Sequence, residues 1–193
     1  MAPPFAAIKT LLVPSEGNIP HMYLDSVGKV TIGIGNLISS APYACTLSLV
    51  NRTTSKAATH QEITADFESV SKQLKGLAPS RYRPFTALDL PSAAIDSLFQ
   101  NRVQEFLRLL KINYPKYDLY PLPAQLALMD LGFNLGVSGL KSTWPKLNQA
   151  IDAQDWKAAS VSCHRPQVNV VRNAEVKRLF EKAPAESGPV RRP

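Results

Sequence analysis

The sequence predicts an α+β fold in which a small antiparallel β lobe precedes a larger helical lobe. Residues 21–38 alternate β-branched side chains with glycines, which is typical of a β-hairpin or a small antiparallel sheet. Residues 124–135 are apolar nearly all round, which is typical of a buried helix. The 193 residues suit one hydrophobic core, and 45% hydrophobic against 19% charged residues excludes a disordered chain.

We therefore expect a single domain over residues 1–185, with a binding cleft between the two lobes. The β lobe is predicted at about 17–58 and the helical lobe at about 59–183. Residues 186–193 follow the last predicted helix, and we expect this tail to be disordered.

The first predicted helix runs over residues 6–13. Pro14 disfavours a helical conformation of the residue before it, so we expect the helix to end there and Glu16 to lie just beyond it. The hairpin that follows turns at residues 26–29, where Gly28 suits a backbone with positive φ.

Helices dominate after residue 58. Thr59 and Glu62 have the spacing of a capping box, which predicts the start of a helix. Apolar residues then recur every three or four positions and predict one buried face: Ile63, Phe67, Val70 and Leu74. Residues 79–91 and 114–123 predict two proline-rich connections. The remaining helices are expected at about 92–110, 124–135, 145–153, 156–163 and 173–183, with the polar Asp130 inside the second of them.

The net charge of +7 indicates an anionic partner, which leaves nucleic acid, a membrane surface or an acidic cell-wall polymer. Nucleic acid is the weakest of these, because no basic run exceeds two residues and no nucleic-acid-binding motif is present. The thiols and imidazoles are scattered: Cys45, Cys163, His21, His60 and His164. We expect no metal and no cofactor, and two unrelated thiols, although a single disulfide stays open. The first residues lack the basic start of a secretory signal, and no apolar run approaches the roughly 20 residues of a membrane span.

Three polar residues, Glu16, Asp25 and Thr31, stand in a string with the spacing E-G-x7-D-x2-G-x2-T-x-G-x-G. Taken alone, two carboxylates at a helix-to-hairpin junction are most often solvated surface groups. The string as a whole resembles the catalytic signature of phage-type lysozymes, glycoside hydrolase family 24. Two further blocks, at residues 127–136 and 172–180, are similar to the central and C-terminal helices of that family.

The resemblance implies a lysozyme-like fold and a muramidase, which hydrolyses the β-1,4 bond between N-acetylmuramic acid and N-acetylglucosamine in peptidoglycan. Glu16 would be the general acid, and Asp25 with Thr31 would hold the attacking water, which inverts the anomeric centre. Asp25 as a covalent nucleophile, with retention, stays open. The substrate-binding candidates are Phe133, Asn134 and Arg172, although Phe133 is as consistent with the core and Arg172 with an internal acid such as Asp130.

The implied partners are peptidoglycan glycan strands and, for a delivered antibacterial effector, a cognate immunity protein. We expect a monomer that is made in the cytoplasm without a signal peptide. It would act in the periplasm or cell wall after delivery by a secretion system, or through a holin if it is an endolysin. Pro14 and Asn36 depart from the family pattern and keep open a catalytically impaired peptidoglycan-binding module. Residues 77–123 exceed what a minimal phage enzyme needs and have no assigned role.

Overall fold

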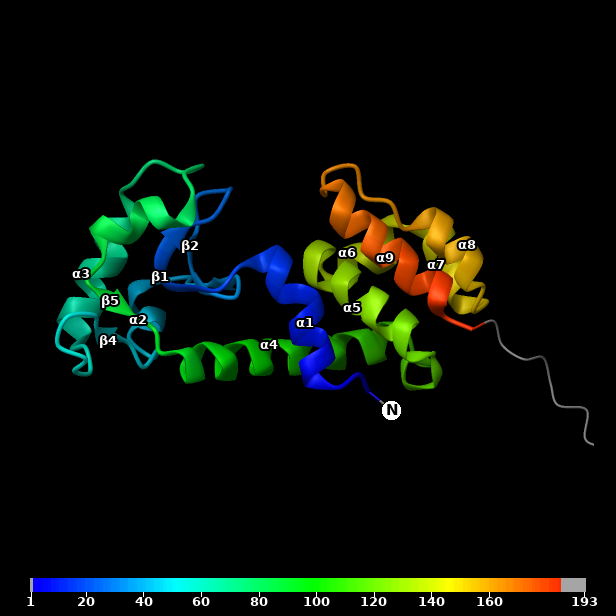
Figure 1. Cartoon of the computed structure of the whole chain (residues 1–193), viewed down its shortest axis with the longest axis horizontal. Coiled ribbons are helices and arrows are strands. Elements are labelled where there is room, and N and C mark those ends of the chain that lie inside the picture. Colours follow the sequence, from blue (N-terminus) through cyan, green and yellow to red (C-terminus); the bar gives the residue numbers. More distant parts are fainter. Residues whose placement is uncertain (1, 185–193) are drawn as a thin grey trace, which may run out of the picture. The chain divides into compact units, whose positions relative to one another are not determined.

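The computed structural model describes residues 2–184, and it confirms an α+β fold (Figure 1). The chain divides into two compact units. Unit 1 comprises the chain up to Ser15 and from Val103 onward, and unit 2 comprises Glu16–Arg102. The predicted lobes separate strands from helices, whereas each of these units gathers residues that pack together, so their bounds differ. The predicted tail at 186–193 lies outside the described residues.

The first helix, α1 (Phe5–Glu16), is longer than predicted. Pro14 lies inside it, so the prediction that the helix ends at this proline is wrong. Pro14 cannot donate to the carbonyl of Thr10, and its ring crowds that carbonyl, but the backbone stays helical for the two residues that remain in α1. The hydroxyl of Thr10, whose carbonyl has lost that partner, donates to the carbonyl of Ala6 at 3.0 Å. As a result, Glu16 is the last residue of α1 and does not lie beyond it.

Unit 2 contains the predicted antiparallel sheet, with strands in the order β1 (Ile19–Leu24), β2 (Val30–Gly33) and β3 (Asn36–Leu37). The turn between β1 and β2 is closed by the amide of Asp25, which donates to the carbonyl of Lys29 at 2.9 Å. Gly28 has a φ of +89° in this turn, as predicted.

Helix α3 (His60–Ser71) packs on this sheet and starts at the predicted capping box. The amide of Glu62 donates to the hydroxyl of Thr59, and the amide of Thr59 donates to the carboxylate of Glu62 at 2.7 Å. Within the predicted apolar face, Ile63 and Val70 are buried. The prediction is wrong for Leu74, which is 79% exposed because the helix ends before it.

A second, two-stranded sheet was not predicted. It pairs β4 (Val50–Asn51) with β5 (Leu88–Asp89), and the other short elements of unit 2 are α2 (Ala41–Ala44) and the 3-10 helix η1 (Pro79–Phe85). The predicted connection at 79–91 therefore contains both η1 and β5.

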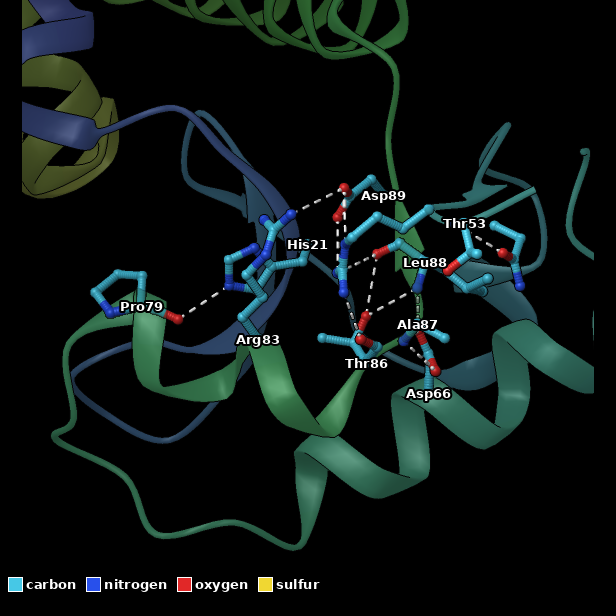
Figure 2. Close-up of polar contacts among 11 residues, drawn as sticks. His21, Thr53, Asp66, Pro79, Arg83, Thr86, Ala87, Leu88 and Asp89 are labelled. Carbon is cyan, nitrogen blue, oxygen red and sulfur yellow. Dashed lines mark hydrogen bonds and ion pairs between the residues drawn. The ribbon is translucent and has the colours of Figure 1, made fainter. Parts of the chain in front are cut away.

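Polar side chains fix this sheet (Figure 2). The carboxylate of Asp66 accepts from the amides of Ala87 and Leu88 at 3.0 and 2.9 Å. Arg52 donates through two nitrogens to the carboxylate of Asp89. Burial by itself would raise the pKa of Asp89, but the hydrogen bond and charge of Arg52 lower it overall.

His21 on β1 is 4% exposed, and its Nε2 bonds the carbonyl of Pro79 at 3.0 Å (Figure 2). Its Nδ1 is buried and has no hydrogen-bond partner among residues 2–184. Burial lowers the pKa of His21, so the uncharged ring is favoured in the folded protein.

Unit 1 is helical and is built around α5 (Leu122–Leu135), which confirms the predicted buried helix. Most of its residues are buried, and it packs against α6 (Val137–Thr143) and α9 (Val170–Lys182). The other elements here are η2 (Tyr117–Leu119), α7 (Pro145–Asp152) and α8 (Trp156–Ser162). The helix α4 (Ser92–Asn113) contributes residues to both units. Over residues 2–184, no helix combines the length and the apolarity that a membrane crossing requires.

Candidate active site

The three predicted catalytic residues, Glu16, Asp25 and Thr31, all belong to unit 2. Glu16 ends α1, and Asp25 follows β1 directly. Oδ1 of Asp25 accepts from the backbone amides of Val27 and Lys29 at 3.0 and 2.8 Å. The hairpin turn therefore fixes the position of the Asp25 carboxylate.

Thr31 is a buried polar residue, 4% exposed, in β2. Its hydroxyl donates to the carbonyl of Lys29 at 3.1 Å. In the antiparallel register Thr31 lies opposite Tyr23 of β1, so the two side chains share one face of the sheet.

Tyr23 of β1 is a third candidate group in unit 2, and no motif of the sequence singles it out. Burial raises the pKa of the Tyr23 phenol, the carboxylates of Glu16 and Asp25 raise it further, and Arg102 lowers it. One buried phenol is thus within electrostatic range of both carboxylates. Tyr23 lies near the end of β1, two residues before Asp25.

Gly35 and Arg102 surround the carboxylate of Glu16. A Cβ atom at Gly35 would lie 3.3 Å from Oε2 of Glu16 and 3.4 Å from a terminal nitrogen of Arg102. That Arg102 nitrogen also donates to the carbonyl of Gly35. Arg102 belongs to no motif of the sequence, although it stands three residues after the buried Phe99, where a charge on an apolar helix face is a signal.

The predicted substrate-binding residues belong to unit 1. Phe133 is 6% exposed, and its ring centroid lies 4.9 Å from that of Phe106. Asn134 accepts through Oδ1 from Arg165 at 3.3 Å. Nε of Arg172 donates to Oδ2 of Asp130 at 2.9 Å, so this arginine does contact an internal acid.

Asp130 is the centre of a buried charge cluster. It is 1% exposed, and its Oδ1 lies 2.8 Å from a terminal nitrogen of Arg165, which is itself fully buried. Burial lowers the pKa of the Arg165 guanidinium, while Asp130 opposes this shift. Asn173 adds a hydrogen bond to the backbone carbonyl of Arg165 at 2.8 Å. Arg165 was missed because it stands in a connection with no hydrophobic period.

A pocket of about 900 Å³ in unit 1 reaches this cluster. Its walls come from α1, α5 and α9, and its charged lining residues are Asp130, Arg172 and Glu175. Cys45 and Cys163, the two thiols whose pairing the sequence left open, are both free.

The groups in unit 2 can transfer protons and position a water molecule. Two carboxyl groups, a hydroxyl and a phenol are the components of general acid and base catalysis. Among residues 2–184, no group of three or more His, Cys, Asp and Glu side chains could hold a metal ion. Comparison of the chain with models of known protein families and with curated proteins gives no match. The resemblance to phage-type lysozymes therefore depends on the residues and their spacing alone.

Proposed function

We propose that this protein is a peptidoglycan hydrolase with a lysozyme-like fold, a muramidase that cleaves between N-acetylmuramic acid and N-acetylglucosamine. One observation carries the proposal. Asp25 directly follows β1, Thr31 of β2 pairs with Tyr23 of β1, and Gly35, which follows β2, approaches Oε2 of Glu16. The three polar residues of the lysozyme-like string lie as follows: Glu16 ends α1, Asp25 follows β1 and Thr31 lies in β2.

In the proposed mechanism, Glu16 donates a proton to the departing glycosidic oxygen. Asp25, held by the amides of Val27 and Lys29, accepts a proton from the attacking water, and the Thr31 hydroxyl orients that water. This division of roles inverts the anomeric centre and requires a carboxyl separation of roughly 6.5–9.5 Å. A separation of about 5 Å would instead make Asp25 the nucleophile and give retention.

The predicted substrate-binding residues of unit 1 are proposed to contact a glycan. Arg172 lines the large pocket of this unit and is the candidate for a lactyl or peptide carboxylate of the wall. Asn134 is the candidate for a sugar hydroxyl or acetamido group, and it would keep its bond from Arg165. Phe133, at 6% exposed, would support the neighbouring Asn134 by packing against Phe106.

The proposed setting is an antibacterial effector or an endolysin that reaches the cell wall after synthesis in the cytoplasm. The net charge of +7 would attract the protein to the anionic wall. An effector of this kind would have an immunity protein as its second partner.

The test is muropeptide analysis of purified peptidoglycan after digestion by the wild type and by Glu16→Gln. We expect fragments with reducing-end muramic acid from the wild type and none from the variant. The exposed Glu105, which pairs with Arg108 in unit 1, provides the control, and Glu105→Gln should digest like the wild type. Products with 1,6-anhydro ends would indicate a lytic transglycosylase, and no products from the wild type would refute the enzyme. Sedimentation with peptidoglycan but no products would support the binding module.

A further inference from the structure

We propose that an edge of unit 2 docks onto the surface of an anionic lipid bilayer. This edge, called here the lysine-leucine edge, consists of six residues: Val27, Lys29, Lys72, Leu74, Lys75 and Leu77. They come from the β1–β2 turn and from the segment that follows α3. The inference does not depend on the proposed hydrolase activity.

The two segments are in direct contact. A Cβ atom at Gly28 would lie 3.2 Å from Cδ and 3.5 Å from Cβ of Lys75, so the lysine stem lies against the turn. In Figure 1 the blue turn and the green segment after α3 lie at the same end of unit 2. The contact holds the stem of Lys75 against the β1–β2 turn, so the two segments adjoin.

The edge exposes large aliphatic side chains. Val27 is 65% exposed, Leu74 is 79% exposed and Leu77 is 42% exposed. Single exposed apolar residues are normal on protein surfaces, but here three stand on adjoining segments. Side chains of this kind gain free energy when they enter the boundary between headgroups and acyl chains. A hydrated polysaccharide has no comparable apolar layer, and this favours a bilayer as the occupant.

The same edge is basic. Lys29, Lys72 and Lys75 are exposed on it. Lys72 lies 4.0 Å from Glu68, but both side chains are more than half exposed, so water and salt weaken the pair. The Asp25 carboxylate is engaged by the amides of the turn. Lysines interleaved with aliphatic side chains are complementary to negatively charged headgroups above an apolar layer.

The experiment measures co-sedimentation of the full chain with vesicles of phosphatidylglycerol and phosphatidylcholine, and with vesicles of phosphatidylcholine alone. We expect binding to the anionic vesicles and much weaker binding to the neutral ones. A lysine near an anionic surface contributes about fivefold to the partition coefficient, so Lys29→Gln, Lys72→Gln and Lys75→Gln together should lower it roughly a hundredfold. Leu74→Ser with Leu77→Ser should also lower it, although the charge is unchanged.

Matched controls remove the same features from unit 1. Lys116→Gln, Lys146→Gln and Lys157→Gln remove three exposed charges, and Leu119→Ser replaces a leucine that is 78% exposed. These variants should bind the anionic vesicles within a few fold of the wild type. Failure of the wild type to bind, or equal losses from the edge and control lysines, would overturn the proposal. Normal binding by the Leu74→Ser, Leu77→Ser variant would also overturn it, because a purely electrostatic contact does not need a bilayer. Circular dichroism of each variant confirms that it is folded.

Discussion

Replacing Asp130 by alanine should be among the most damaging single substitutions in unit 1. Asp130 neutralises Arg165, which is fully buried, and also contacts Arg172, whose side chain is 10% exposed. Without the carboxylate, the Arg165 guanidinium remains in the core with no opposite charge beside it. The Arg165 side chain has no exposed surface in the folded protein, so its guanidinium loses its partner at a poorly solvated position.

The expected cost follows from this geometry. Removing one partner of a buried ion pair lowers the free energy of unfolding by about 3–5 kcal/mol, because the remaining charge has lost its solvation and its partner. For a chain of this size, that corresponds to a fall in Tm of roughly 6–20 °C. The double variant Asp130→Leu, Arg165→Met removes both charges of the pair, and we expect it to lose less than Asp130→Ala alone.

The assay is urea unfolding followed by tryptophan fluorescence. The chain has two tryptophans, Trp144 and Trp156, and both belong to unit 1, so the signal reports on the unit that contains Asp130. As a control, Glu105→Ala breaks an exposed pair with Arg108 and should cost less than about 1 kcal/mol. The reasoning is refuted if Asp130→Ala costs no more than this control, or if the double variant is less stable than Asp130→Ala.

Three further substitutions test other parts of the structure. The pKa of His21 is lowered from its ordinary value of 6.5, so the unfolded chain takes up this proton first and stability should fall as pH drops below about 6.5. Urea unfolding gives the free energy of unfolding at each pH between about 5.5 and 7.5. This free energy should change less with pH for His21→Gln than for the wild type, and the same pH dependence in both proteins would contradict the burial of His21. Gly35→Ala should cost about 1–2 kcal/mol at its φ of +62° and lower the rate of peptidoglycan digestion, because the new Cβ would lie 3.3 Å from Oε2 and force Glu16 to shift. The control is Gly76→Ala, which has similar backbone strain at a φ of +83° but places its new Cβ more than 4 Å from any neighbouring atom, so it should keep the activity. Equal activities of Gly35→Ala and Gly76→Ala would refute the role of Gly35. Thr59→Ala should destabilise α3 by about 1 kcal/mol in thermal unfolding, and no change would mean that the capping box contributes nothing.

Local patterns predicted much of the fold. The capping box at Thr59 and the apolar helix at 124–135 depend on residues close together in sequence, and both are confirmed. The predicted end of α1 at Pro14 was wrong, because a proline disfavours the helical conformation of the residue before it and does not forbid it. Leu74 was assigned to a buried face because the apolar period continues beyond the point where the helix ends.

The candidate site was predictable only where its residues belong to a continuous motif. Glu16, Asp25 and Thr31 were found from their spacing, whereas Arg102 and Arg165 were not. Arg102 contacts Gly35, which is 67 positions away, and Arg165 contacts Asp130 from a segment without hydrophobic periodicity. Such contacts depend on how distant elements pack, and no local pattern encodes them.

The most direct measurement of hydrolysis by Glu16 and Asp25 is digestion of purified peptidoglycan in water that carries a heavy oxygen isotope. Mass spectrometry of the fragments then shows whether that oxygen has entered the new muramic acid ends. We predict one labelled oxygen for each bond that the wild type cleaves, and no labelled ends from Glu16→Gln or Asp25→Asn. Unlabelled ends, or equal labelling by the wild type and the Glu16→Gln variant, would contradict the proposed roles of these two carboxyl groups.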